Sequence, residues 1–112
     1  MKKADVFEMI RDTANKYGFE FEQNGNYAAI RDGWDYSNSW VNFTIYETPH
    51  WDMTKNTVEV EVTVKAAISQ MGGHPTVETL RKAAETISRA ADLVEALAAM
   101  KLAYTVEMKE GE

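Results

Sequence analysis

The chain of 112 residues has no cysteine and only two prolines. The lack of cysteine excludes disulfides and thiol chemistry, and a zinc site would have to use histidine and carboxylates alone. No stretch approaches the roughly 20 apolar residues that a membrane-spanning helix needs. The first residues lead into an amphipathic pattern instead of the apolar segment of a signal peptide. These absences predict a cytoplasmic protein with no membrane partner.

Clustered basic residues are missing as well. The net charge is −6, from 18 acidic and 12 basic side chains, and the adjacent basic pairs are Lys2-Lys3 and Arg81-Lys82. Direct nucleic-acid binding is therefore disfavoured, because contact with phosphates needs a basic patch. Hydrophobic residues make up 45% of the chain and charged residues 27%. This composition is typical of a folded protein, and the length predicts a single domain over residues 1–112.

Two segments have the periodicity of amphipathic helices. The first covers residues 4–17 and is followed by Gly18, which we expect to adopt the left-handed cap conformation, with Phe19 packing back on the helix. The second covers residues 76–100, with Thr76 as its amino-terminal cap. Its apolar residues at helical spacing are Val77, Leu80, Ala84, Ile87, Ala91, Val94 and Leu97.

Apolar and polar residues alternate with strand periodicity in the rest of the chain. The Asn24-Gly25 pair predicts a two-residue hairpin turn, which sets Phe21 opposite Ala28 and Phe19 opposite Ile30. Further strands are predicted near residues 40–47, 57–68 and 102–108. The strict alternation in residues 57–68 indicates one buried face and one solvated face.

These elements predict an α+β fold with the element order αββββαβ. We expect a single-layer antiparallel sheet of about five strands with both helices on one face. Because antiparallel neighbours are commoner than parallel ones, the favoured spatial order of the strands is 4-3-2-1-5.

Aromatic residues are the least ordinary feature. All three tryptophans lie between residues 34 and 51, and amphipathic aromatic side chains concentrate on contact surfaces. The strand pattern places some of them among acids on the sheet face opposite to the helices. The predicted partner-binding residues are Trp40, Tyr46, Tyr27, Trp34, Tyr36, Trp51, Glu59 and Glu61. The alternative is that the tryptophans pack in or over the core, because large apolar groups are interior by default.

Groups suited to catalysis are sparse. His50 and His74 are the only histidines, and their loops are expected at opposite ends of the sheet. The glutamates on solvated strand faces give no water-shielded carboxylate pair. No phosphate-loop, nucleophile or calcium motif is present, so we predict no catalytic residue, metal or cofactor. Gly73 and His74 precede the second helix, where backbone N–H groups can hold an anion, although a simple turn also explains them.

The leading hypothesis is a small acidic cytosolic protein-interaction module without catalytic activity, such as an accessory or inhibitor protein of a bacterium or phage. Its partner is another protein, or a second copy of the chain. The alternative is a small-molecule-binding protein or enzyme, with a pocket between sheet and helices or at the sheet end where Trp34 and His74 could meet. A structural homodimer subunit is the third hypothesis.

Overall fold

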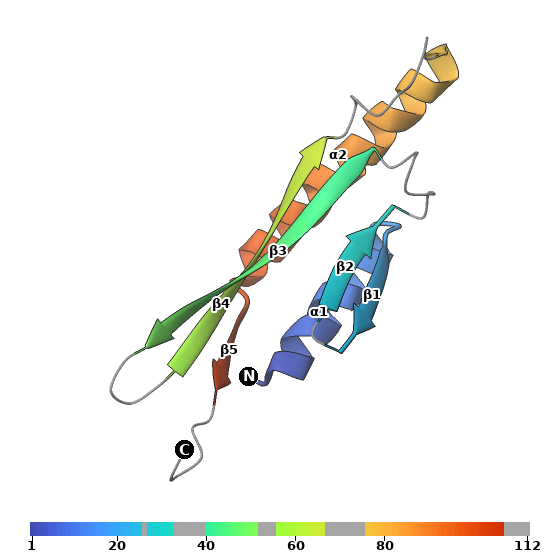
Figure 1. Cartoon of the computed structure of the whole chain (residues 1–112). Helices are drawn as coiled ribbons and strands as arrows, with labels where there is room; N and C mark the ends of the chain where they lie inside the picture. The colour runs from blue at the N-terminus through green and yellow to red at the C-terminus, as the bar shows by residue number, and fades with distance from the viewer. Residues whose placement is uncertain (26, 33–39, 52–55, 67–75, 107–112) are drawn as a thin grey trace.

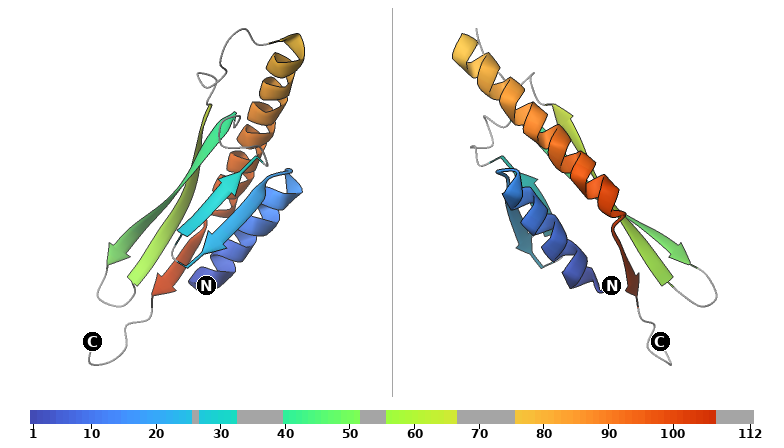
Figure 2. Two further views of the ribbon diagram at one scale, coloured as in Figure 1. Left: turned by 45° about the vertical axis from the view of Figure 1, so that its right-hand side comes forward. Right: turned by 180° about the vertical axis from the view of Figure 1, so that it is seen from behind.

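The computed structural model describes residues 1–25, 27–32, 40–51, 56–66 and 76–106. The element order αββββαβ is the one predicted. The elements are α1 (Lys3–Lys16), β1 (Glu20–Asn24), β2 (Tyr27–Arg31), β3 (Val41–Trp51), β4 (Asn56–Ala66), α2 (Val77–Met100) and β5 (Ala103–Val106). The molecule is elongated, with extents of 60 × 24 × 20 Å, and both helices lie on the same side of the strands (Figure 1 and Figure 2).

The carboxyl end of α1 confirms the predicted glycine cap. The N–H of Phe19 donates to the carbonyl of Ala14 at 2.9 Å, and the N–H of Gly18 donates to the carbonyl of Asn15 at 3.1 Å. Gly18 has a φ of 82°, and a Cβ at this position would lie 2.7 Å from Nη1 of Arg89. Glycine is therefore required both for the left-handed backbone and for the close approach of the arginine.

The amino end of α2 also agrees with the prediction, because the Thr76 hydroxyl accepts a hydrogen bond from the N–H of Thr79 at 3.1 Å. However, the stripe of residues that α2 buries lies beside the predicted stripe. Its buried residues are Ala83, Thr86, Ala90, Leu93 and Leu97. By contrast, Val77 and Leu80 of the predicted stripe are 65% and 48% exposed. Thr86 fits the core because its hydroxyl donates within the helix, to the carbonyl of Lys82 at 3.0 Å.

β1 and β2 form the predicted hairpin, but the predicted register is wrong by two residues. Phe21 pairs with Ile30 instead of Ala28, and Asn24 pairs with Tyr27. Gly25, with a φ of 61°, is consequently the first residue of the two-residue loop and not the second. Two-residue hairpin loops also favour glycine at the first central position, so Gly25 is compatible with this register as well as with the predicted one. A displacement by two residues keeps every side chain on its predicted face.

The strands form two sheets, so the predicted single sheet of five strands is wrong. One sheet has the order β1-β2 and the other the order β3-β4-β5. β2 lies beside β3, but no ladder joins these two strands. Side chains connect the sheets instead: the rings of Phe19 and Phe43 meet edge to face, with centroids 5.1 Å apart.

β5 pairs antiparallel with β4, so the predicted strand order 4-3-2-1-5 is also wrong. Glu59 stands opposite Ala103, and Asn56 stands opposite Val106. The reason is that α2 returns along β4, and only two residues separate its end from β5 (Figure 1). The chain therefore keeps the direction of the helix when it enters β5, which runs opposite to β4. Lys101 makes this junction in the left-handed conformation, with a φ of 50°.

β3 and β4 form a long two-stranded ribbon that runs from the Val41–Ala66 pair to the Trp51–Asn56 pair. The expected loop around Pro49 and His50 is wrong, because these residues continue β3. Proline is compatible with this position because β3 pairs on one side only. The predicted strand residues 67–68 and 107–108 lie outside the described residues.

The core lies between the helices and the inner faces of the strands. Its largest fully buried side chains are Phe19, Ile10, Leu93, Val6 and Thr86.

We expect Gly18→Ala to lower the free energy of unfolding by about 2 kcal/mol, because alanine is strained at positive φ and its Cβ displaces Arg89. Urea denaturation measures the change. Gly25→Ala is the matched control, since Gly25 also has a positive φ but no atom within 4 Å of a Cβ there. Equal losses in the two variants would contradict the role given to the close contact with Arg89.

Candidate interaction surface

The end of the β3–β4 ribbon that lies away from α2 is the candidate surface. We call its residues, 46–51 and 56–61, the distal ribbon (Figure 1). All six residues that β3 contributes to the distal ribbon are exposed, and all six belong to the regular strand. On the other strand of the ribbon, Val58 and Val60 are buried. The β3 side of the distal ribbon is therefore the open side.

One face of the distal ribbon combines an aromatic ring with acids. Tyr46 is half exposed and stands opposite Glu61 on β4. Two residues further along each strand, Thr48 stands opposite Glu59. The Glu59 carboxylate lies 3.2 Å from Nε2 of His50, and both side chains are exposed. This is the sheet face opposite to the helices, as predicted for Tyr46, Glu59 and Glu61.

Trp51 lies on the other face of the distal ribbon. It lies five positions after Tyr46 in the same strand, and successive side chains of a strand alternate between faces. Its exposed fraction is 67%. Asn56 on β4 stands opposite Trp51, and the exposed Val106 on β5 stands opposite Asn56. The distal ribbon therefore presents a large aromatic side chain on each face.

Tyr27 is a third exposed aromatic residue, on the β1–β2 hairpin. Its side chain is 53% exposed, and its hydroxyl accepts a hydrogen bond from Arg31 at 3.1 Å. The same arginine pairs with Glu22, with Nε 3.1 Å from the carboxylate. Tyr27 is thus open to solvent but belongs to a different sheet from Tyr46.

Trp40 is placed in the core instead of on the open sheet face. Only 5% of it is exposed, and it precedes the first residue of β3. Its backbone N–H donates to the buried carboxylate of Asp32 at 3.0 Å, which fixes the chain where it crosses from β2 to β3. Trp40 and Tyr46 consequently do not share a surface in this structure.

Four predicted site residues lie outside the described residues: Trp34, Tyr36, Gly73 and His74. Their roles in partner or ligand binding stay predictions.

A polar cluster that the sequence analysis missed anchors the base of the distal ribbon. The Tyr104 hydroxyl donates to Oε1 of Glu47 at 2.6 Å, and Nζ of Lys3 lies 3.5 Å from the same oxygen. The Lys3 ammonium also lies over the rings of Phe7 and Tyr104, at 5.6 and 5.8 Å from their centroids. A signal existed, because Glu47 follows Val41, Phe43 and Ile45 with period 2 and so extends an inward-facing row. The cluster joins α1, β3 and β5.

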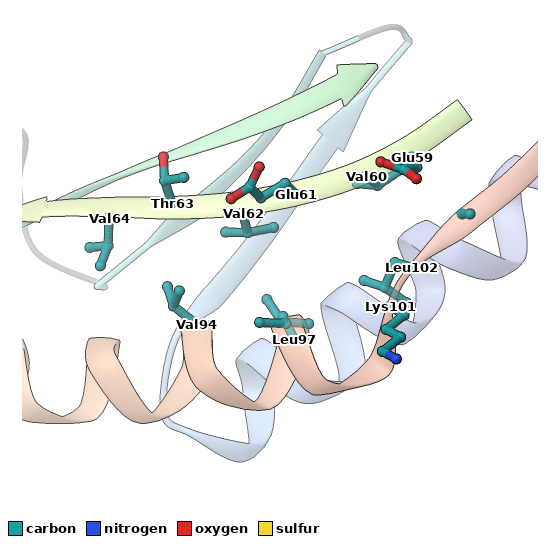
Figure 3. A pocket seen from close by; sticks show the side chains of 12 residues that line it. Glu59, Val60, Glu61, Val62, Thr63, Val64, Val94, Leu97, Lys101 and Leu102 are labelled. Atoms are coloured by element: carbon teal, nitrogen blue, oxygen red, sulfur yellow. The ribbon is translucent and has the colours of Figure 1, made fainter. Parts of the chain in front are cut away.

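A cavity of about 630 Å³ lies between β4 and the carboxyl-terminal half of α2 (Figure 3). Val62 and Val64 point from the strand towards Val94 and Leu97 on the helix, while Glu61 and Thr63 point away from it. Leu102 and Lys101 border it where the helix ends. The walls are mainly apolar, and one side is the edge of β4 beyond the end of β5.

Within the described part of the chain, no group of three or more histidine, cysteine or carboxylate side chains could hold a metal ion. None of the described helices is long and apolar enough to cross a membrane. No family model, curated protein or solved structure matches this chain.

Burial, together with the hydrogen bond and the charge of Glu47, raises the pKa of Tyr104 to about 12. An ordinary tyrosine has a pKa near 10. The unfolded chain therefore loses this proton first, so the stabilisation by Tyr104 is complete below about pH 10 and is lost as the pH rises towards 12. We expect Tyr104→Phe to remove a phenolate step near pH 12 in an absorbance titration. Glu47→Gln should lower that step without restoring the ordinary value, because burial is the largest cause of the shift.

Proposed function

We propose that this chain is a protein-interaction module that binds a partner with a basic surface through the distal ribbon. The observation that carries the proposal is the run of six exposed residues in a continuous strand, with Tyr46 and Trp51 at its two ends. Tyrosine and tryptophan are the residues on which interface energies most often depend. Two aromatic side chains on opposite faces suit a partner that contacts both faces of the ribbon.

The charges of the distal ribbon favour a basic partner. Glu59 and Glu61 are exposed beside Tyr46, and the whole chain carries a net charge of −6. Opposite charge on the partner speeds association and selects against acidic competitors. A protein with a basic nucleic-acid site meets this description, so an inhibitor that occupies such a site is one form of the proposed function.

Tyr27 adds a further exposed aromatic residue, which lies on the β1–β2 hairpin and not on the distal ribbon. Trp40 is not part of the proposed surface, because it is buried.

We expect Tyr46→Ala and Trp51→Ala each to weaken partner binding at least about tenfold, because each removes an exposed aromatic anchor. The measurement is capture of the partner from a lysate on the immobilised chain, followed by titration of the purified pair. Thr44→Ala, on the same strand and face as Tyr46, is the matched control and should leave the affinity unchanged.

Salt provides an independent check on the charge argument. Raising the ionic strength from about 0.05 to 0.5 M should weaken the wild-type complex and affect the double variant Glu59→Gln/Glu61→Gln much less. If neither the aromatic variants nor the charge variants change the affinity for the partner, the distal ribbon is excluded as the contact surface.

One observation favours a second candidate function, the binding of a small apolar molecule. The cavity between β4 and α2 has a volume of about 630 Å³, within the usual range of ligand pockets. Apolar side chains from both elements line it, which suits a hydrocarbon-rich ligand.

Native mass spectrometry of the purified chain tests this second candidate. We expect an additional bound mass in the wild type, and its loss in Val94→Trp, which places an indole in the cavity. Val77→Trp, at the other end of the same helix, should retain the bound mass. A wild type without bound mass, also after incubation with a medium-chain fatty acid, would speak against a ligand here.

A further inference from the structure

α2 carries a second apolar stripe beside the core, which covers it only in part: Ile87 and Val94 pack against the core, and the other members are exposed. Its residues, separated alternately by three and four positions, are Val77, Leu80, Ala84, Ile87, Ala91, Val94 and Ala98; we call them the α2 seam. The alanines, Val77 and Leu80 are exposed, and Ile87 and Val94 are half-buried. Alternation of three and four is the spacing by which one helix packs along another.

Small and large residues alternate along the α2 seam. Alanine occupies three positions spaced by seven, and a larger residue lies between each two of them. If a second α2 runs antiparallel, with the two-fold axis beside residue 89, each alanine faces a large residue. The pairs, counted once, are Ala84 with Val94, Ala91 with Ile87, and Ala98 with Leu80. Such pairs let two helices approach closely without voids.

Charges beside the α2 seam select the same register. Arg81 and Glu95 flank the seam on its solvent side, both are exposed, and neither forms an ion pair with another described residue. In the antiparallel register, Arg81 of each copy lies beside Glu95 of the other, and Ser88 lies beside its own copy at the axis. A parallel pair would set each residue beside its own copy, which loses both ion pairs and leaves alanine facing alanine. The charge pattern is therefore complementary to itself in one orientation only.

We propose that the α2 seam binds the α2 of a second copy in this antiparallel register, so that the chain forms a homodimer. The cavity beside β4 supports the same arrangement, because Val94 and Ala98 belong both to its lining and to the seam. Leu80 of the second copy, seated against Ala98, covers the mouth of the cavity. Tyr46 and Trp51, the aromatic residues of the distal ribbon, are not among the residues that line this cavity or form the seam, so the dimer does not rest on the proposed function.

The first test is the molar mass of the whole chain by sedimentation equilibrium. We expect a dimer of twice 12.7 kDa. Arg81→Glu and Glu95→Arg should each raise the dimer dissociation constant about tenfold, because two attractive pairs become repulsive. The double variant Arg81→Glu/Glu95→Arg should restore the wild-type value. Asp92→Arg, which changes an exposed acid on the side of α2 away from the seam, is the matched control.

A second test reports the orientation and uses the absence of cysteine from the chain. Ser88→Cys should be cross-linked between copies by a short bismaleimide reagent, and Asp92→Cys should not. Ala91→Lys should abolish the dimer and leave the circular dichroism spectrum unchanged, because Ala91 is exposed in the single chain.

A wild type that stays at 12.7 kDa up to about 100 μM would overturn the proposal and leave the seam to a helix of another protein. A dimer that resists both charge reversals and Ala91→Lys would overturn it as well. The monomeric Ala91→Lys variant keeps its distal ribbon, so failure of the dimer and failure of partner binding are distinguishable.

Discussion

The contact of Arg89 with the end of α1 holds together two units that share no strand ladder. The Arg89 guanidinium donates to the carbonyls of Tyr17 and Gly18, at 2.9 and 3.3 Å, and lies 4.8 Å from the centroid of the Phe19 ring. It thereby binds carbonyls that a helix end leaves unsatisfied, and its positive charge suits the negative end of the helix dipole. Since β2 and β3 form no ladder, the placement of α1 and its hairpin against the ribbon depends on this contact, on the cluster of Lys3, Glu47 and Tyr104, and on apolar packing. Residues 46–51, the β3 part of the distal ribbon, lie outside these contacts between α2 and α1 and are exposed.

Local chemistry made much of the fold predictable. Gly18 and Thr76 identified helix ends because each caps the helix through groups in the same turn. The alternating valines of β4 identified a buried face because successive side chains of a strand point to opposite faces. The hairpin register was wrong because Gly25 fits either position of a two-residue loop. The sheet order was wrong because it depends on how far α2 carries the chain back along β4, and side-chain periodicity contains no such information.

The stripes of α2 show a second limit of pattern reasoning. Two stripes of residues on α2 have helical spacing. The stripe that packs in the core includes Thr86, which is polar and is therefore not counted when only apolar residues define the stripe. A buried hydroxyl that donates within its own helix costs little, so polarity alone did not reveal the inner face. For the candidate surface, the strand pattern placed Tyr46 and its acids on the open face. It could not place Trp40, which is buried just before β3 begins, where its backbone N–H donates to Asp32.

The neighbourhood of β5 has a consequence for how the chain folds. The N–H of Thr105 donates to the carbonyl of Met1 at 3.0 Å, and Tyr104 meets Glu47 near the first turn of α1. These contacts join residues separated by most of the sequence, so their loop-closure entropy is lost before packing compensates for it. On the ribosome, the first turn of α1 has no β5 to pack against until α2 has been synthesised. Until then, the valines of β4 beside β5 remain uncovered. The β3–β4 ribbon is therefore most prone to wrong strand pairing at this stage of synthesis.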